Sequence, residues 1–300
     1  MAHKSVLLKE AIDCLALESG DVYLDATLGS GGHLEEVAKR TRGNVELLGV
    51  DTDQMSLAIA KENLDLSGVK YKAVELNFRN IEKAPELLDA KQPSKILFDL
   101  GWSSPQFEEG ARGFSFQKEE PLIMSLKSNV SEEDITAHDV VNSWDEENLA
   151  TVIYGYGEEK YSRRIAKAIV EARANKPIET SLELAEIIKK AVPVFYRFGR
   201  IHPATKTFQA IRIAVNDELR ALQEGLSGAF TILRKGGRVA VISFHSLEDR
   251  IVKNFFREKV ESGEAEYIED FGKKPLTASP EEVAENPRSR SAKLRVIRKI

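Results

Sequence analysis

The chain has 300 residues, of which 43 are Lys or Arg and 48 are Asp or Glu, so its formal net charge is -5. A content of 42% hydrophobic and 30% charged residues is that of an ordinary globular protein and excludes a disordered or fibrous chain. The length predicts about two domains, and the lack of any run of about 18 apolar residues predicts no membrane partner. The single cysteine, Cys14, excludes a disulfide framework. Because the first twenty residues also lack a signal-peptide pattern, we expect a cytoplasmic protein.

Short apolar runs alternate with helical patterns over the first hundred residues, which is typical of an α/β unit with parallel strands. We expect strands at residues 22–25, 46–51, 71–76 and 95–100. The helical patterns between them lie at residues 33–40, 54–66 and 81–88. This order predicts the first part of a Rossmann-like sheet.

The character of the chain changes from about residue 107 to about residue 202. Helical periodicity dominates there, at residues 146–153, 162–174 and 182–192, and no strand pattern is present. The α/β pattern then returns, with an expected strand at 238–243, a helix capped by Ser246 and Asp249, a loop or hairpin at 261–285 and a closing strand at 292–300. We therefore predict a sheet domain formed by residues 1–106 and 203–300, interrupted by an all-helical, substrate-recognising insertion at 107–202.

A glycine-rich turn, DATLGSGGH at residues 25–33, follows the first expected strand and opens a helix. Gly29, Gly31 and Gly32 let the backbone approach a ligand closely, and the free amides of the helix start face it. Asp51 ends the second strand nineteen residues after Gly32, where a carboxylate can accept hydrogen bonds from both ribose hydroxyls. This arrangement serves both nicotinamide dinucleotides and S-adenosylmethionine.

Two details favour S-adenosylmethionine over a dinucleotide. The dinucleotide fingerprint requires Gly or Ala three residues after Gly31, where this chain has Leu34. Asp25 ends the strand before the turn, and its charge would repel a pyrophosphate but attract an ammonium or sulfonium group. A nicotinamide oxidoreductase, and a tight turn that binds nothing, are the alternatives.

A second motif, DLGWSSPQ at residues 99–106, follows the apolar strand that ends at Asp99. In a doubly wound sheet this strand end lies beside the cofactor crevice. An acid followed by a Ser104–Pro105 turn suits transfer to an exocyclic amine, because hydrogen-bond acceptors localise the nitrogen lone pair and aim it at the methyl carbon. We therefore expect Asp99, Ser104 and Pro105 to be catalytic, unless Asp99 only caps the turn.

Positive charge is concentrated in two stretches that contain no acid, at residues 187–216 and 286–300. Together they carry +12, which leaves -17 on the other 255 residues. Such blocks can focus a polyanion on one face of an acidic protein, although solvated helix faces give the same pattern. We expect both stretches to frame the pocket lined by Asp25, Asp51 and Asp99. The histidines have no metal-ligand spacing, so no metal site is expected.

Nine segments of the chain resemble the RsmH (MraW) family of bacterial small-subunit ribosomal RNA cytosine-N4 methyltransferases. The segments run in order from HKSVLLKEAID near the start through DATLGSGGH, GVDTD, DLGWSSPQF, RGFSF, YGEEKYSRRIAKAI, HPATKTFQAIRIAVNDEL and GGRVAVISFHSLEDRIVK to NPRSRSAKLRVI. The resemblance implies a class I, Rossmann-like methyltransferase fold with a helical insertion. It also implies S-adenosyl-L-methionine as cofactor and a cytidine in the decoding region of 16S ribosomal RNA, within the small subunit, as substrate. A homodimer is compatible with this reading.

The resemblance implies that Gly31, Gly32, His33, Asp51, Phe78, Asp99 and Gln106 lie at the cofactor, and that Phe244 and His245 lie at the substrate. The motifs themselves add Asp25 and Gly29 to the cofactor site. Trp102, beside the site, and Arg197 and Arg200, in the basic stretch, are expected at the substrate.

The chain departs from the family pattern after RGFSF. Residues 120–127 read EPLIMSLK, where the family usually has GPLDMRMD, so two acids and an arginine are replaced between Ile123 and Lys127. Trp102 stands where the family usually has a small aliphatic residue. The alternative function is therefore a catalytically weakened member that acts as an RNA-binding factor in ribosome assembly.

Overall fold

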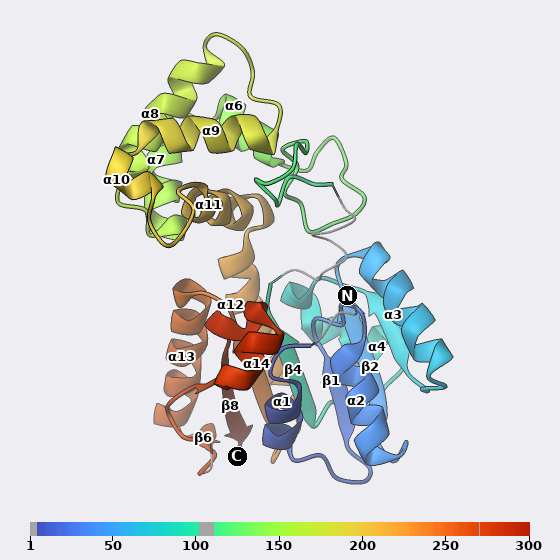
Figure 1. Ribbon diagram of the computed structural model, residues 1–300. Coiled ribbons are helices and arrows are strands. Elements are labelled where there is room, and N and C mark those ends of the chain that lie inside the picture. Colours follow the sequence, from blue (N-terminus) through green and yellow to red (C-terminus); the bar gives the residue numbers. More distant parts are fainter. Residues whose placement is uncertain (1–4, 102–110, 270) are drawn as a thin grey trace. The chain divides into compact units, whose positions relative to one another are not determined.

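The computed structural model describes residues 5–101, 111–269 and 271–300, and the chain divides into two units. One contains residues 1–103 and 219–300, and the other contains residues 104–218 (Figure 1). The second boundary lies at 218/219 rather than at the expected 202/203, because helix α11 (Ala204–Asn216) packs on α7 (Glu146–Gly157) within the helical unit. Gly157 permits this approach, since a Cβ there would lie 2.6 Å from the carbonyl oxygen of Lys206.

The first unit is built on a mixed β-sheet, with eight strands among the described residues, in the order β3-β2-β1-β4-β5-β8-β6, and with β7 paired to β8. The strands are β1 (Val22–Asp25), β2 (Glu46–Asp51), β3 (Lys72–Glu75), β4 (Lys95–Asp99), β5 (Arg238–Ser243), β6 (Ala265–Tyr267), β7 (Leu276–Thr277) and β8 (Lys293–Lys299). Strands β3, β2, β1, β4 and β5 are parallel, and β8 runs antiparallel to β5. This Rossmann-like order confirms the predicted fold class.

Helices cover both faces of the sheet because its central strands are apolar on both sides. One core combines Leu24, Ile96 and Phe98 with α12 and α13, and the opposite core combines Tyr23 and Leu97 with α1, α2 and α3. The helices of this unit are α1 (Leu8–Leu15), α2 (Gly32–Thr41), α3 (Gln54–Leu66), α4 (Ala84–Leu87), α12 (Glu218–Ile232), α13 (Ser246–Glu261) and α14 (Pro280–Glu285), with 3₁₀ turns η1 (Phe78–Lys83) and η2 (Pro287–Ser291).

Two segments differ from the sequence expectation. The helix expected at 81–88 forms the 3₁₀ turn η1 followed by the single turn α4, which begins at Ala84–Pro85. Proline lacks the backbone N–H that a continuous helix would need at that point. In the loop expected at 261–285, the short strands β6 and β7 do not form a hairpin with each other but each pairs with β8.

The second unit is helical, as the periodicity predicted. Its helices are α6 (Ala137–Ser143), α7 (Glu146–Gly157), α8 (Ser162–Arg173), α9 (Ser181–Ala191), α10 (Val194–Arg197) and α11 (Ala204–Asn216). They share one core, in which Leu149, Ile165 and Ile188 are fully buried. Across the described part of the chain, no helix is long and apolar enough to cross a membrane.

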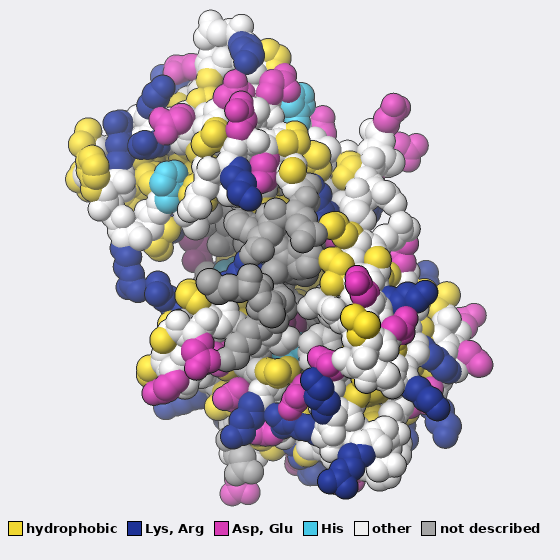
Figure 2. Space-filling view, turned by 45° about the vertical axis from the view of Figure 1, so that its right-hand side comes forward, with side chains coloured by type: hydrophobic (Ala, Val, Ile, Leu, Met, Phe, Trp, Pro, Cys, Tyr) yellow, Lys and Arg dark blue, Asp and Glu magenta, His cyan; other side chains and the backbone are white. Residues whose placement is uncertain are grey.

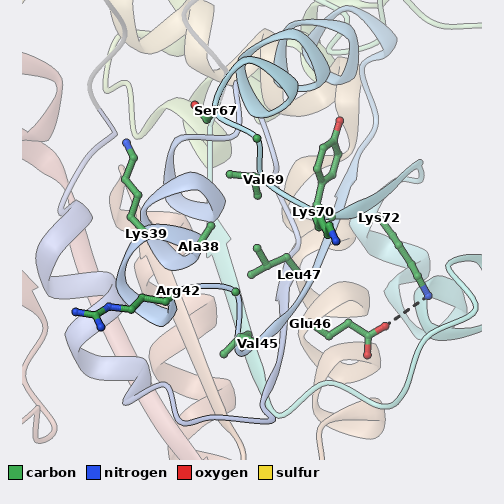
Figure 3. Close-up of a pocket in the computed structure, with 13 residues that line it drawn as sticks. Ala38, Lys39, Arg42, Val45, Glu46, Leu47, Ser67, Val69, Lys70 and Lys72 are labelled. Carbon is green, nitrogen blue, oxygen red and sulfur yellow. Dashed lines mark ion pairs between the residues drawn. The ribbon is translucent and has the colours of Figure 1, made fainter.

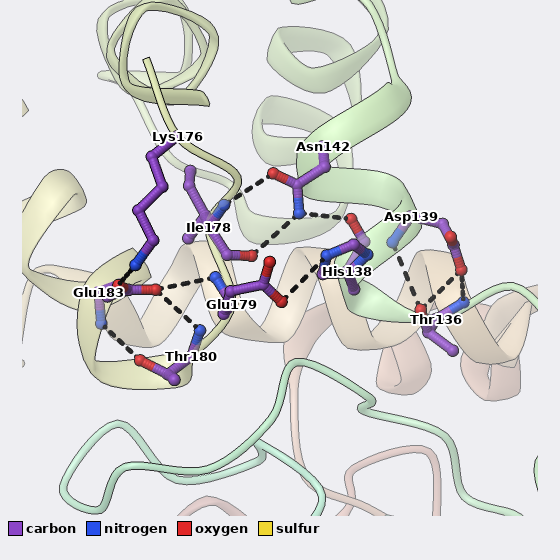
Figure 4. A network of polar contacts seen from close by, with 9 residues as sticks. All are labelled: Thr136, His138, Asp139, Asn142, Lys176, Ile178, Glu179, Thr180 and Glu183. Carbon is purple, nitrogen blue, oxygen red and sulfur yellow. Dashed lines mark hydrogen bonds and ion pairs between the residues drawn. The ribbon is translucent and has the colours of Figure 1, made fainter. Parts of the chain in front are cut away.

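Polar side chains fix the starts of two of these helices (Figure 4). Thr136 and Asp139 form a reciprocal capping box at α6, and Thr180 and Glu183 form another at α9. Asn142 joins the two regions, because its side chain accepts a hydrogen bond from the Ile178 backbone N–H and donates one to the Ile178 carbonyl, at 2.9 Å each. Caps of this kind contribute about 1 kcal/mol each to helix stability.

The segment that departs from the family pattern is held by contacts within the helical unit. Buried Arg112 donates hydrogen bonds to the carbonyls of Ser125 (3.1 Å) and Leu126 (3.2 Å). Asn216 on α11 accepts from the Leu126 N–H at 2.8 Å and donates to the Met124 carbonyl at 2.7 Å. The replaced residues therefore stand in a segment whose backbone is bonded on both sides.

Candidate active site

Three carboxylates end three neighbouring parallel strands at the same edge of the sheet. Asp25 of β1 pairs in register with Gly49 of β2 and with Leu97 of β4. Asp51 and Asp99 stand two residues further along β2 and β4, so their side chains project from the carboxyl edge beside Asp25. The structure thus brings together the three acids that the sequence placed at strand ends.

The glycine-rich turn takes the conformation for which glycine is needed. Gly29 (φ 53°) and Gly31 (φ 85°) are left-handed, and Gly31 is the N-cap of α2. A Cβ on Gly32 would lie 2.3 Å from the Oγ atom of Ser5. The turn therefore brings backbone N–H groups and the start of a helix to the carboxyl edge, where a ligand can approach them.

Asp51 is tied to the turn. Its carboxylate accepts hydrogen bonds from the backbone N–H groups of Gly29 (2.8 Å) and Asp53 (2.9 Å). Burial raises its pKa to about 6 despite these bonds. Each carboxylate oxygen keeps a further lone pair, so the group can still accept hydrogen bonds from a pair of hydroxyls.

Asp25 is almost completely buried, with 1% of its surface exposed. It accepts hydrogen bonds from the Thr27 N–H (3.1 Å) and the Tyr23 hydroxyl (3.2 Å). Burial raises its pKa to about 7, although both bonds act in the opposite direction. An anion buried without a counter-ion is costly, so a cationic ligand at this edge would be stabilised by Asp25.

Among the three acids, Asp99 has a buried carboxylate oxygen that accepts no hydrogen bond from the described residues. Its backbone N–H donates to the Oγ1 atom of Thr27 at 2.7 Å, and His33 Nδ1 lies 3.7 Å from its Oδ2 atom. Its Oδ1 atom is buried and has no hydrogen-bond partner among the described residues. Burial, followed by the charges of Asp25 and Glu248, holds its pKa well above the usual range. A ligand that carries N–H donors or positive charge fits this oxygen.

His33 and Phe78 support the same edge in different ways. His33 is 5% exposed, and its Nε2 atom lies 3.2 Å from the carbonyl oxygen of Val6, which fixes the ring beside Asp99. Phe78 begins η1 after β3 and packs edge-on against Phe98, with 5.8 Å between ring centroids. Its expected position near an adenine stays a prediction.

Phe244 and His245 follow β5, the next strand along the edge. A Cβ on Gly101 would lie 3.6 Å from the Phe244 ring, which places that ring beside the end of β4. The N-cap of α13 is His245 and its reciprocal partner is Glu248, so the expected cap by Ser246 and Asp249 is wrong. Glu248 accepts from the N–H groups of Phe244 (2.8 Å) and His245 (3.2 Å).

Sequence reasoning missed two residues of this edge, Thr27 and Glu248. Thr27 looked like a neutral member of the glycine turn, whereas its hydroxyl accepts the Asp99 N–H. Glu248 occupies the third helical position after its N-cap, where Glu commonly completes a capping box; that signal could have identified it. Trp102, Ser104, Pro105 and Gln106 lie outside the described residues.

The basic stretch at 286–300 does not frame the site as a whole, contrary to expectation. Lys293 pairs in register with Ser243 at the site edge, but Arg298 pairs with Arg238 at the opposite edge. The reason is that β8 runs antiparallel and spans the sheet. Lys293 and Arg295 also bind Asp249, at 3.0 and 2.7 Å. Burial alone would raise the pKa of Asp249, but the hydrogen bonds from these two cations lower it.

A depression of about 680 Å³ lies where β2 and β3 begin (Figure 3). Its rim carries Lys39, Arg42, Lys70 and Lys72, and its floor includes Leu47 near the start of β2. Because Asp51 stands at the far end of that strand, the depression is separate from the carboxylate edge. The candidate active site is therefore the edge formed by Asp25, Asp51 and Asp99.

Comparisons with known proteins show the family of this chain. A family model described as the MraW methylase family matches residues 1–300. A protein of Sulfurihydrogenibium named ribosomal RNA small subunit methyltransferase H is 47% identical over 99% of both chains. A protein of the same name from Symbiobacterium thermophilum is 44% identical over 99% of this chain and 96% of its own. An rRNA methylase structure from Streptococcus thermophilus, matched over 100% of this chain and 99% of its own, is distant, with 9% identity and a TM-score of 0.44. On the family match and the two relatives, the chain belongs to the MraW methylase family.

Proposed function

We propose that this protein transfers a methyl group from S-adenosylmethionine to the N4 amine of a cytidine in the decoding region of 16S ribosomal RNA. Relatives that match over nearly their whole length are named small-subunit ribosomal RNA methyltransferases. The observation that carries the proposal is the Oδ1 atom of Asp99, a buried acceptor without a partner among the described residues. It lies at the edge that Asp25 and Asp51 share.

The residues present fit the cofactor. When bound, S-adenosylmethionine supplies an electrophilic methyl group on a sulfonium. Asp51 would accept hydrogen bonds from its ribose hydroxyls, and Asp25 would stabilise its positive charge. The left-handed glycines of the turn give the backbone the close approach that this requires.

Asp99 would hold and orient the accepting amine. The lone pair of a cytosine amine is delocalised into the ring, so the amine is a poor nucleophile. An acceptor on its N–H group localises that lone pair, and a fixed position brings the nitrogen to the methyl carbon. The methylated nitrogen is acidic and then loses its proton, so no strong base is needed beforehand. The Oδ1 atom of Asp99 is itself buried, which limits competition from water at this acceptor.

The chain's cysteine content favours N4 over C5 of cytosine. Carbon C5 becomes nucleophilic once a nucleophile such as a thiolate adds to C6. The single cysteine, Cys14, is fully buried in α1, and burial raises its pKa to about 12. A thiol of this kind is not ionised near neutral pH. Direct transfer to the exocyclic amine does not require such a nucleophile.

The departure at 120–127 lies in the helical unit. Its described contacts are made within the helical unit, through Arg112 and Asn216. The three acids and the glycine turn belong to the other unit. The presence of all three acids and of the glycine turn supports turnover over the alternative of a binding factor without activity.

The test uses small ribosomal subunits that lack the modification, incubated with isotopically labelled S-adenosylmethionine. We expect N4-methylcytidine after RNA digestion and nucleoside mass spectrometry, and no product above background from Asp99→Ala. Equal product from both proteins would refute the role of Asp99. Thermal stabilisation by S-adenosylhomocysteine separates the proposal from a nicotinamide enzyme, because the latter would be stabilised by NAD instead.

A further inference from the structure

The helical unit exposes large apolar side chains in one short segment. Val194, Phe195, Phe198 and Ile201 are exposed by 63%, 71%, 85% and 56%. We name this segment the α10 patch. In Figure 2, hydrophobic side chains lie at the edge of the helical unit beside Lys and Arg side chains. Contiguous exposed apolar groups of this kind mark interaction sites in monomeric proteins.

The segment is anchored, so its exposed rings are presented on a fixed support. The Tyr196 hydroxyl donates to the Oε2 atom of buried Glu159 at 2.6 Å, and its ring packs edge-on against Tyr161. Arg197 donates to the carbonyls of Val192 (3.2 Å) and Lys190 (3.0 Å) at the end of α9. Phe195 lies on α10 and Phe198 is the C-cap residue of that helix, and both rings are left to solvent.

The segment that contains the patch carries only positive charges. It lies in the stretch 187–216, which contains six cations and no acid. Arg200 is exposed and has no acidic partner within ion-pair distance among the described residues. Lys189 is paired with Glu186 at 3.2 Å, while Arg197 contacts carbonyls and keeps its net charge. A ligand that combines planar apolar faces with negative charge is complementary to this surface.

We propose that Phe195 and Phe198 are stacking platforms for unpaired bases of the substrate RNA, with Arg197 and Arg200 contacting the adjacent phosphates. Single-stranded RNA presents flat base faces next to a phosphate chain, and aromatic side chains recognise it in this way. The inference rests on the proposed function, which makes RNA the substrate. A second copy of this chain would bring the same positive charge to the interface, so it is less complementary than RNA.

The experiment measures binding of a fluorescently labelled 12-nucleotide single-stranded RNA of mixed sequence by anisotropy, with the intact protein. Each of Phe195→Ala and Phe198→Ala should weaken binding about tenfold, which corresponds to about 1.4 kcal/mol. Ile135→Ala, which shortens another exposed apolar residue of the same unit (52% exposed), should bind like wild type. Binding of the same RNA in duplex form should be insensitive to both rings.

Two further variants separate stacking from simple apolar contact. Phe198→Leu keeps an apolar side chain but loses the ring, so it should bind as weakly as Phe198→Ala. Phe198→Trp should bind like wild type, and its fluorescence, measured against the wild-type background, should be quenched by RNA. Wild-type affinity for both alanine variants, or for Phe198→Leu, would overturn the inference.

Sedimentation without RNA tests the alternative occupant. A dimer that Phe195→Ala and Phe198→Ala dissociate would identify the patch as a subunit interface and overturn the inference. If the two alanine substitutions weaken binding to small subunits but not to free RNA, the patch contacts a protein partner, and this result would also overturn the inference. Ring-dependent binding of free RNA by a protein that transfers no methyl group would support the inference and refute the proposed function.

Discussion

The buried carboxylate Asp25 is expected to reduce the stability of the ligand-free protein while serving the site. Asp25→Asn keeps the shape of the side chain. In the wild type the Thr27 N–H donates to the carboxylate at 3.1 Å, and the amide oxygen of the variant can still accept this hydrogen bond. The substitution removes a charge that is 1% exposed. We predict that it raises the free energy of unfolding near pH 8 and weakens S-adenosylmethionine binding.

The magnitude follows from the pKa of Asp25, which burial raises from 3.8 to about 7. A pKa difference of one unit corresponds to about 1.4 kcal/mol. The stability gained from holding the proton in the folded state is complete below pH 3.8 and is lost as the pH rises through about 7. Compared with a side chain that does not ionise, Asp25 therefore lowers the free energy of unfolding by about 4 kcal/mol at pH 8. At pH 5 the folded protein keeps the proton while the unfolded chain loses it, and the free energy of unfolding is lower by about 2 kcal/mol.

The assay is urea unfolding of ligand-free wild type and Asp25→Asn at pH 8 and pH 5. The variant should be more stable by about 4 kcal/mol at pH 8 and by about 2 kcal/mol at pH 5. Its affinity for S-adenosylmethionine should fall about 10- to 100-fold, as expected for a lost charge-assisted contact. Equal stability of the two proteins at pH 8, or an advantage of the variant that does not change with pH, would refute this reasoning.

Three other predictions concern packing and charge. Gly32→Ala should destabilise the protein by about 1–3 kcal/mol, because its Cβ would lie 2.3 Å from the Ser5 Oγ atom. Adding Ser5→Gly to this variant removes the clash and should restore the thermal stability. Asp249→Asn should lower the free energy of unfolding at pH 7 by about 1–3 kcal/mol. Denaturant unfolding at several pH values should show that the difference between variant and wild type shrinks as the pH falls below about 4. Reversing Arg197 and Arg200 to Glu should weaken RNA binding with unchanged cofactor affinity, and an equal loss of both in parallel titrations would contradict that separation.

Much of the sheet could be predicted because buried strands require short apolar runs. The strands at 22–25, 46–51 and 238–243 and the helix at 54–66 are confirmed with the expected bounds. The small strands β6 and β7 could not be predicted, because their pairing with β8 depends on tertiary contacts rather than on their own composition.

The site could be predicted as far as strand ends determine it. Asp25, Asp51 and Asp99 meet because parallel strands place their carboxyl ends at one edge. The bonds between the side chains were not predictable, since nothing in the local sequence connects Thr27 with the backbone of Asp99. The charge of a stretch did not reveal its partners either: Lys293 and Arg295 are bound by an acid more than forty residues away.

The position of the transferred methyl group tests the central claim most directly. Small subunits lacking the modification would be treated with trideuteromethyl-labelled S-adenosylmethionine, and the modified cytidine would be fragmented by mass spectrometry. Asp99 as an amine acceptor, together with the buried thiol of Cys14, predicts the label on the exocyclic nitrogen of cytosine. A label on C5 or on the ribose would contradict the account.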